Sequence, residues 1–269
     1  MEDKSLIFSD RPSIINIGDD AVLIHFLADA QGTFFIQYDP EETLSEFEQD
    51  IYFMGEPGIG SEQDILRLEQ IIKKYHMEEI AHKIMMESNY SNYPDVKKLF
   101  YLGDRLAEEY FFREGCTREQ MLEIRGKIAS KVYYLRNPEI IKEIQRQYPG
   151  IKITIVSQAG QYMQGAFELL LERAGVSNVG VIIAPGYMST RYTKLEPELY
   201  RLITENNPAK VTVMIDDNED RTVPARKAGV KTKLYNPGER KAGVILDKDG
   251  RNLLENSEEL IESSLDELG

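Results

Sequence analysis

Asp29, at the end of the apolar run Ala21–Ala28, is the residue best placed to act as a nucleophile. It is followed by Ala30-Gln31-Gly32-Thr33, so a strand that ends in a carboxylate leads into a Gly-Thr turn. Such a strand presents its carboxylate at the carboxyl edge of a parallel sheet, which is where open α/β sheets bind ligands. The segment therefore predicts a reactive carboxylate at that edge.

Three later segments carry polar side chains that could belong to the same site as Asp29. Ser157 follows the largely apolar, β-branched residues Ile153–Val156, and Lys194 precedes Glu196-Pro197, where a helix is expected to begin. Asp216-Asp217 comes directly after the largely apolar run Val211–Ile215. The order and spacing of these segments are stronger evidence for such a site than any one segment alone.

The elements that must position these residues alternate between short apolar runs and amphipathic segments. This alternation predicts an α/β fold with a doubly wound parallel sheet. The predicted strands are Ala21–Ala28, Ile151–Ser157, Val179–Ala184 and Val211–Ile215, and the helices between and after them are Gly165–Ala174, Glu196–Asn206 and Val223–Ala228.

Helical periodicity alone dominates residues 41–136. Ser61 and Thr117 are expected to cap two of the helices, because each is followed by an apolar stripe at helical spacing. The sequence thus predicts two lobes: an α/β core from residues 1–40 and 137–269, and an all-helical cap from residues 41–136.

The four polar segments together resemble the motifs of the haloacid dehalogenase-like (HAD) hydrolase superfamily. Asp29 to Thr33 is similar to its first motif, Asp-x-Asp-Gly-Thr, and Ser157, Lys194 and Asp216-Asp217 are similar to the second, third and fourth. The resemblance is greatest to the branch that carries a helical cap after the first motif. It implies a Rossmann-like core with an inserted helical cap.

The resemblance also implies a phosphohydrolase or phosphotransferase that acts on a small phosphorylated molecule. Asp29 would attack phosphorus and form an aspartyl-phosphate. Ser157 would donate a hydrogen bond to a phosphoryl oxygen, and Lys194 would stabilise negative charge in the transition state. Mg²⁺ would be the cofactor, because it prefers oxygen ligands. Its ligands would be Asp29, Asp216, Asp217 and the main-chain carbonyl of Gln31.

Gln31 departs from the family pattern, in which a second Asp protonates the leaving oxygen and later activates water. An amide has no titratable proton, and loss of such catalysis costs about 10²–10⁴-fold in rate. The departure leaves several alternatives open: hydrolysis of substrates with good leaving groups, accumulation of a phospho-aspartate, or a binding and scaffolding role without catalysis. A phosphonatase-like C–P hydrolase is another, with Lys83, Lys127 or Lys131 as the Schiff-base residue.

The net charge of −14 disfavours nucleic-acid binding, which needs a basic surface. No apolar run reaches the roughly 18 residues of a membrane span, and no signal peptide is evident at the N-terminus. With one cysteine, Cys116, the chain has no intrachain disulfide. A cytoplasmic protein with no nucleic-acid or membrane partner is expected, although an exported effector would have the same features. The oligomeric state is not predicted.

A second Asp-x-Asp-Gly sequence, Asp247 to Gly250, follows the apolar residues Val244–Leu246. No strand and helix series follows it, so it is predicted to be the turn of a hairpin formed by Val244–Asp247 and Asn252–Leu254. A helix is expected at Glu258–Leu268.

Overall fold

The computed structural model describes residues 22–30, 33–55, 61–87, 90, 95–136, 138–185, 192–235, 240–241, 244–245 and 251–267. The chain divides into two compact units. The first comprises the described parts of Met1–Ile36, Leu135–Ala159 and Leu171–Gly269, and the second comprises Gln37–Tyr134 and Gly160–Leu170. The second unit thus includes residues 160–170, which the sequence analysis places in the core.

The first unit is built on a five-stranded parallel sheet with the order β5-β4-β1-β6-β7. Its strands are β1 (Val22–Asp29), β4 (Lys152–Ala159), β5 (Val179–Pro185), β6 (Ala209–Asp216) and β7 (Lys231–Leu234). The predicted doubly wound α/β fold is confirmed. The edge strand β7 was not predicted, because three of its four residues are polar or charged.

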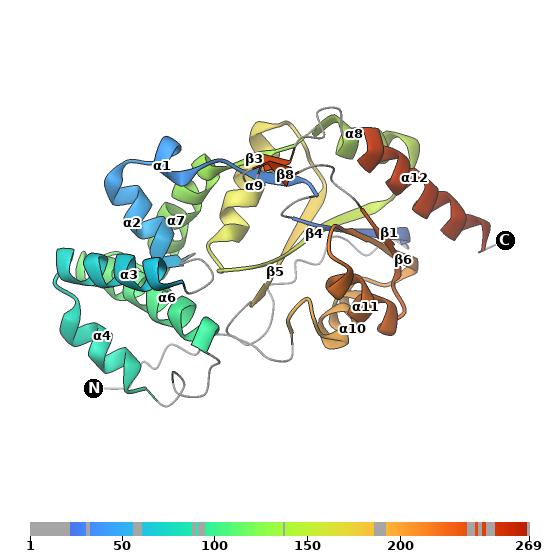
Figure 1. The fold of residues 1–269 in the computed structure, drawn as a ribbon. Helices are drawn as coiled ribbons and strands as arrows, with labels where there is room; N and C mark the ends of the chain where they lie inside the picture. Colours follow the sequence, from blue (N-terminus) through green and yellow to red (C-terminus); the bar gives the residue numbers. More distant parts are fainter. Residues whose placement is uncertain are drawn as a thin grey trace. The chain divides into compact units, whose positions relative to one another are not determined.

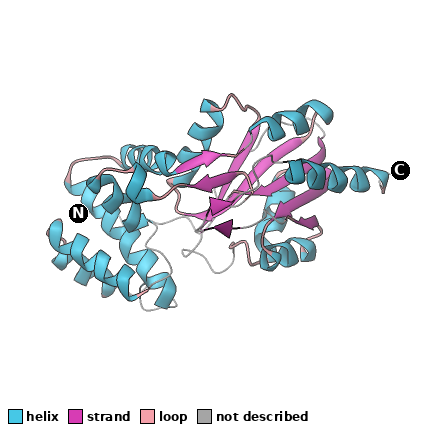
Figure 2. Ribbon diagram, turned by 45° about the horizontal axis from the view of Figure 1, so that its top comes forward, coloured by secondary structure: helices cyan, strands magenta, loops and turns pink. Residues whose placement is uncertain are grey.

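Helices cover both faces of this sheet (Figures 1 and 2). On one face, α10 (Pro197–Asn206) and α11 (Glu219–Lys227) pack together, and Leu199, Tyr200 and Ala225 bury apolar surface against the strands. On the other face, α12 (Arg251–Asp266) contacts α8 (Pro138–Gln147), β6 and β7. This two-sided burial explains why the strands are nearly continuous apolar runs.

The second unit is largely helical. It contains α1 (Pro40–Thr43), α2 (Glu46–Gly55), α3 (Glu62–Lys74), α4 (Glu78–Met85), α6 (Asp95–Arg113) and α7 (Arg118–Val132). Ser61 and Thr117 cap α3 and α7 through reciprocal capping boxes, as predicted. The helix α9 (Met163–Arg173) begins in this unit and ends in the first.

Two predictions of secondary structure were wrong. Residues 133–135 are not helical: they form the strand β3 (Tyr133–Leu135), which pairs with β2 (Phe35–Gln37). Asn252–Leu254 is not a strand but the start of α12, whose buried Leu253, Leu260 and Ile261 have helical spacing. Val244–Ile245, strand β9, instead pairs with β8 (Arg240–Lys241). The predicted turn at Asp247–Gly250 and the segment Asp19-Asp20 lie outside the described residues.

Among the described residues, no helix combines the length and the hydropathy needed to cross a membrane.

A buried histidine makes the stability of the first unit depend on pH. His25 on β1 is fully buried, and its Nε2 lies 2.8 Å from Thr154 Oγ1. Burial, and secondarily the charge of Lys152, lowers the pKa of His25 to about 3. Below about pH 6.5 the unfolded chain therefore binds a proton at this position that the folded chain does not bind.

We predict that His25 lowers the free energy of unfolding by about 1.4 kcal/mol for each pH unit from 6.5 toward 3. In the His25→Gln variant, the loss of stability between pH 6.5 and pH 5 should be smaller by about 2 kcal/mol, measured by urea denaturation. His82→Gln, at an exposed position of α4, is the matched control. An equal effect of the two replacements would contradict the prediction.

Candidate active site

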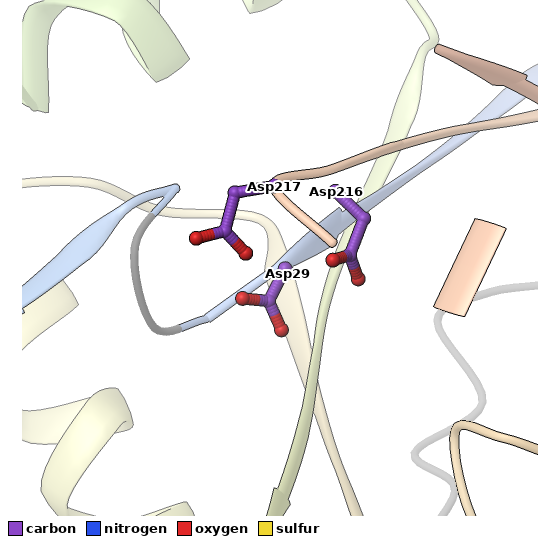
Figure 3. A group of neighbouring side chains, drawn as sticks. All are labelled: Asp29, Asp216 and Asp217. Carbon is purple, nitrogen blue, oxygen red and sulfur yellow. The ribbon is translucent and has the colours of Figure 1, made fainter. Parts of the chain in front are cut away.

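The carboxylates predicted from the sequence lie at the ends of two neighbouring strands. Asp29 is the last residue of β1, Asp216 is the last residue of β6, and Asp217 follows it (Figure 3). The chain leaves β1 toward β4 and leaves β6 toward β7, in opposite directions across the sheet. The site therefore occupies a topological switch point, the position where open α/β sheets bind ligands.

Lys194 contacts the carboxylates at the ends of both strands. Its Nζ forms an ion pair with Asp29 Oδ1 and lies 2.8 Å from Asp216 Oδ2. The side chain of Lys194 is 0% exposed, and both carboxylates are buried. An ammonium group inside the site thus offsets the repulsion between two acidic side chains that the sheet holds side by side.

Burial governs the charge of Asp29. Removal from water raises the pKa of Asp29 to about 6, with a further upward contribution from Asp216, while Lys194 and Arg221 act in the opposite direction. The carboxylate form, which is the nucleophilic one, therefore depends on the two neighbouring cations.

Main-chain contacts hold Lys194 and Asp216 in place. The hydroxyl of Tyr200, on α10, lies within hydrogen-bonding distance of two carbonyl oxygens, 3.1 Å from that of Lys194 and 3.3 Å from that of Arg221. Lys194 N–H donates to Gln158 Oε1 at 3.3 Å. Asn218 N–H donates to Asp216 Oδ1 at 2.9 Å, and the Asn218 side chain caps α11.

Arg221 belongs to the site although the sequence analysis did not identify it. Its Nη1 lies 3.4 Å from Asp29 Oδ1 and 3.9 Å from Asp216 Oδ1. Gln158 and Tyr200 were also missed. The sequence did contain a signal for Arg221. This residue comes five positions after Asp216, on a helix that starts at the strand end, so its side chain is about one turn from the acidic pair.

Two further residues, Ser157 and Gln31, were predicted to belong to the site. Ser157 is buried on β4, one residue beyond Val156, which is the register partner of Asp29. The strand was predicted to end at Ser157, but it continues to Ala159, because residues 157–159 pair with β5. Gln31 lies outside the described residues.

The arrangement fits a hard divalent cation. Asp29, Asp216 and Asp217 each offer a carboxylate oxygen, and these oxygens all lie within 4.8 Å of one another. Asp29 Oδ2 is buried and accepts no hydrogen bond from the described residues. A buried, unpartnered carboxylate oxygen is costly, and coordination to a cation would remove that cost. Clustered carboxylates are the protein ligands that Mg²⁺ prefers.

No protein-family model matches this chain, and no curated protein matches it. Among solved structures, it is similar to a HAD-family enzyme from Bacteroides thetaiotaomicron in complex with magnesium and inorganic phosphate, at 13% identity and a TM-score of 0.40, over 82% of this chain and 98% of that one. It is also similar to a haloacid dehalogenase-like family hydrolase from Xanthomonas campestris, at 12% identity and a TM-score of 0.42, over 93% of this chain and 98% of that one.

At 12–13% identity the reaction has to be inferred from the residues of this chain.

We predict that Lys194→Met lowers the free energy of unfolding by about 3–5 kcal/mol, because it leaves two buried carboxylates without their ammonium partner. Urea denaturation at pH 7.5 measures the change. Lys227→Met, at an exposed position of α11, removes the same charge without touching the carboxylates and should have an effect below about 0.5 kcal/mol. The prediction fails when the two variants are equally stable.

Proposed function

We propose that this protein is a Mg²⁺-dependent phosphohydrolase or phosphotransferase of the HAD type, acting through an aspartyl-phosphate on a small phosphorylated molecule. The observation that carries the proposal is the cluster of Asp29, Asp216 and Asp217 at the switch point of the sheet, with Lys194 between the strand ends. Carboxylates and an ammonium group so arranged are suited to phosphoryl transfer.

Asp29 would be the nucleophile. One of its carboxylate oxygens forms a bond to phosphorus while the bond from phosphorus to the leaving oxygen breaks. Water then attacks the phosphorus of the aspartyl-phosphate, which releases inorganic phosphate and restores Asp29. In phosphotransfer an acceptor alcohol takes the place of water. Splitting the displacement in two makes each step easier.

The remaining roles follow from charge and position. Asp29, Asp216 and Asp217, with the main-chain carbonyl of Gln31, would hold Mg²⁺. When bound, the ion would offset the repulsion between carboxylate and phosphate and polarise the phosphoryl group. Lys194 would stabilise negative charge that develops in the transition state, and Ser157 would donate a hydrogen bond to a phosphoryl oxygen.

Gln31 limits the range of substrates that the proposed mechanism can cleave. An alkoxide leaving group needs a proton as the bond to phosphorus breaks, and an amide cannot supply one. An acyl phosphate expels a carboxylate, which is stable without protonation. We therefore infer that acyl phosphates are better substrates than phosphate esters of simple alcohols.

Contacts in the second unit weigh against the phosphonatase alternative. Lys127 Nζ pairs with Glu123 at 2.5 Å, and Lys131 pairs with Glu48. Lys83 is exposed on α4. A Schiff-base lysine needs a desolvated, neutral amine, whereas ion pairs and water stabilise the ammonium form.

We predict that the wild type hydrolyses acetyl phosphate only with Mg²⁺ and that Asp29→Asn abolishes this activity, because an amide is a poor nucleophile. Gln31→Asp should raise hydrolysis of glycerol phosphate by about 10²–10⁴-fold and change hydrolysis of acetyl phosphate little, since only the first reaction lacks a proton donor. Phosphate release measures both rates. Equal acceleration of the two substrates would contradict the assigned role of position 31.

A binding role without turnover is the second candidate, and Gln31 is the observation that favours it. This role predicts that the wild type binds inorganic phosphate with Mg²⁺ in a calorimeter but hydrolyses neither substrate. Turnover appearing only in Gln31→Asp would support it, and turnover in the wild type would exclude it.

A further inference from the structure

Arg221 is the one cation of the described site that has both a carboxylate neighbour and solvent access. It lies on the first turn of α11, and 29% of its side chain is exposed, against 0% for Lys194. Its Nη1 lies 3.4 Å from Oδ1 of the proposed nucleophile Asp29. A ligand that entered to meet Asp29 would therefore meet this guanidinium as well.

Arg221 interacts with its two carboxylate neighbours through charge, and these contacts do not use up its N–H donors. The distances of 3.4 Å to Asp29 and 3.9 Å to Asp216 exceed the 2.7–3.2 Å of ordinary N–H···O hydrogen bonds. Within the described residues, the guanidinium, with its five N–H donors, has these two ion pairs and no hydrogen bond. It can thus donate to a ligand without giving up a hydrogen bond of its own.

The backbone of Arg221 is fixed from two directions. The Asn218 side chain accepts from Asp220 N–H at 2.9 Å and so caps α11. The hydroxyl of the buried Tyr200 lies 3.3 Å from the Arg221 carbonyl oxygen. A guanidinium on an anchored backbone loses less freedom when it binds a ligand, which favours affinity.

We propose that Arg221 binds the phosphoryl group of the substrate, an inference that rests on the proposed function. The phosphorus atom must come within bonding reach of Asp29, and Arg221 Nη1 lies 3.4 Å from an oxygen of that carboxylate, which puts the guanidinium within reach of the phosphoryl oxygens. The guanidinium fork matches two phosphoryl oxygens, which a single ammonium point charge cannot do.

Charge supports the same role. Asp29, Asp216 and Asp217 carry three negative charges against two positive charges on Lys194 and Arg221. With the proposed Mg²⁺ added, the site would be about neutral without Arg221 and positive by about one charge with it, which favours a dianionic phosphoryl group. Arg221 adds that charge at the rim of the site, where the overall net charge of −14 would otherwise repel an anion.

The test is direct binding of inorganic phosphate in the presence of MgCl₂, measured by isothermal titration calorimetry. Arg221→Ala should weaken phosphate binding by about 10- to 100-fold, the usual value of a charged hydrogen bond, and raise the KM for acetyl phosphate by a similar factor. Arg221→Lys should recover part of the affinity. Arg226→Ala, at an exposed position of the same helix, is the matched control and should bind phosphate as the wild type does.

The outcomes separate this inference from the proposed function. Failure of the wild type to bind phosphate would overturn both. Binding by the wild type and equally tight binding by Arg221→Ala or Arg221→Lys would overturn the role of Arg221 alone. Circular dichroism of each variant reports folding, and Arg221→Lys keeps the test decisive if Arg221→Ala does not fold.

Discussion

The buried ammonium group of Lys194 is the feature on which the geometry of the site depends. The parallel sheet brings Asp29 and Asp216 to the ends of adjacent strands, where both are removed from water. Two like charges about 4 Å apart repel by about 4 kcal/mol at the effective dielectric constant near a protein surface. Lys194 contacts both carboxylates, and its attraction to each of them offsets that repulsion.

Much of the surrounding structure positions this lysine. Lys194 precedes α10, and Tyr200 on the first turns of α10 packs into the core with Leu27, Val156 and Met214. The Tyr200 hydroxyl also reaches the main chain of the two segments that carry the cations. Packing of one buried aromatic ring therefore fixes the main chain at Lys194, in the turn before α10, and at Arg221, on α11, and so the hydrophobic core supports the electrostatics of the site.

The distribution of charge divides the site into an inner and an outer part. Lys194 is enclosed with Asp29 and Asp216, whereas Arg221 retains exposed surface. A buried charge is constrained by its partners, and a half-exposed one can exchange water for a ligand. This division is why the inner ammonium group suits charge compensation and the outer guanidinium suits recognition of an anion.

The sequence by itself determined the alternation of strands and helices. Near-continuous apolar runs are typical of strands that are buried on both faces of a parallel sheet. It also indicated Asp29, Lys194 and Asp216-Asp217, since each follows or precedes such an element. It failed where the signal was weak: the polar edge strand Lys231–Leu234 and the helix that starts at Arg251 instead of a second hairpin strand.

Only the tertiary structure decided which side chains meet. Residues 29, 194 and 216 are far apart along the chain, and their contacts exist because β1 and β6 are neighbours in the sheet. Arg221, Gln158 and Tyr200 belong to no motif. Their roles follow from the packing of α10 and α11 beside those strand ends and, for Gln158, from its place on β4 next to Lys194. Local sequence patterns encode the period of an element, whereas the meeting of distant polar groups depends on how the elements pack.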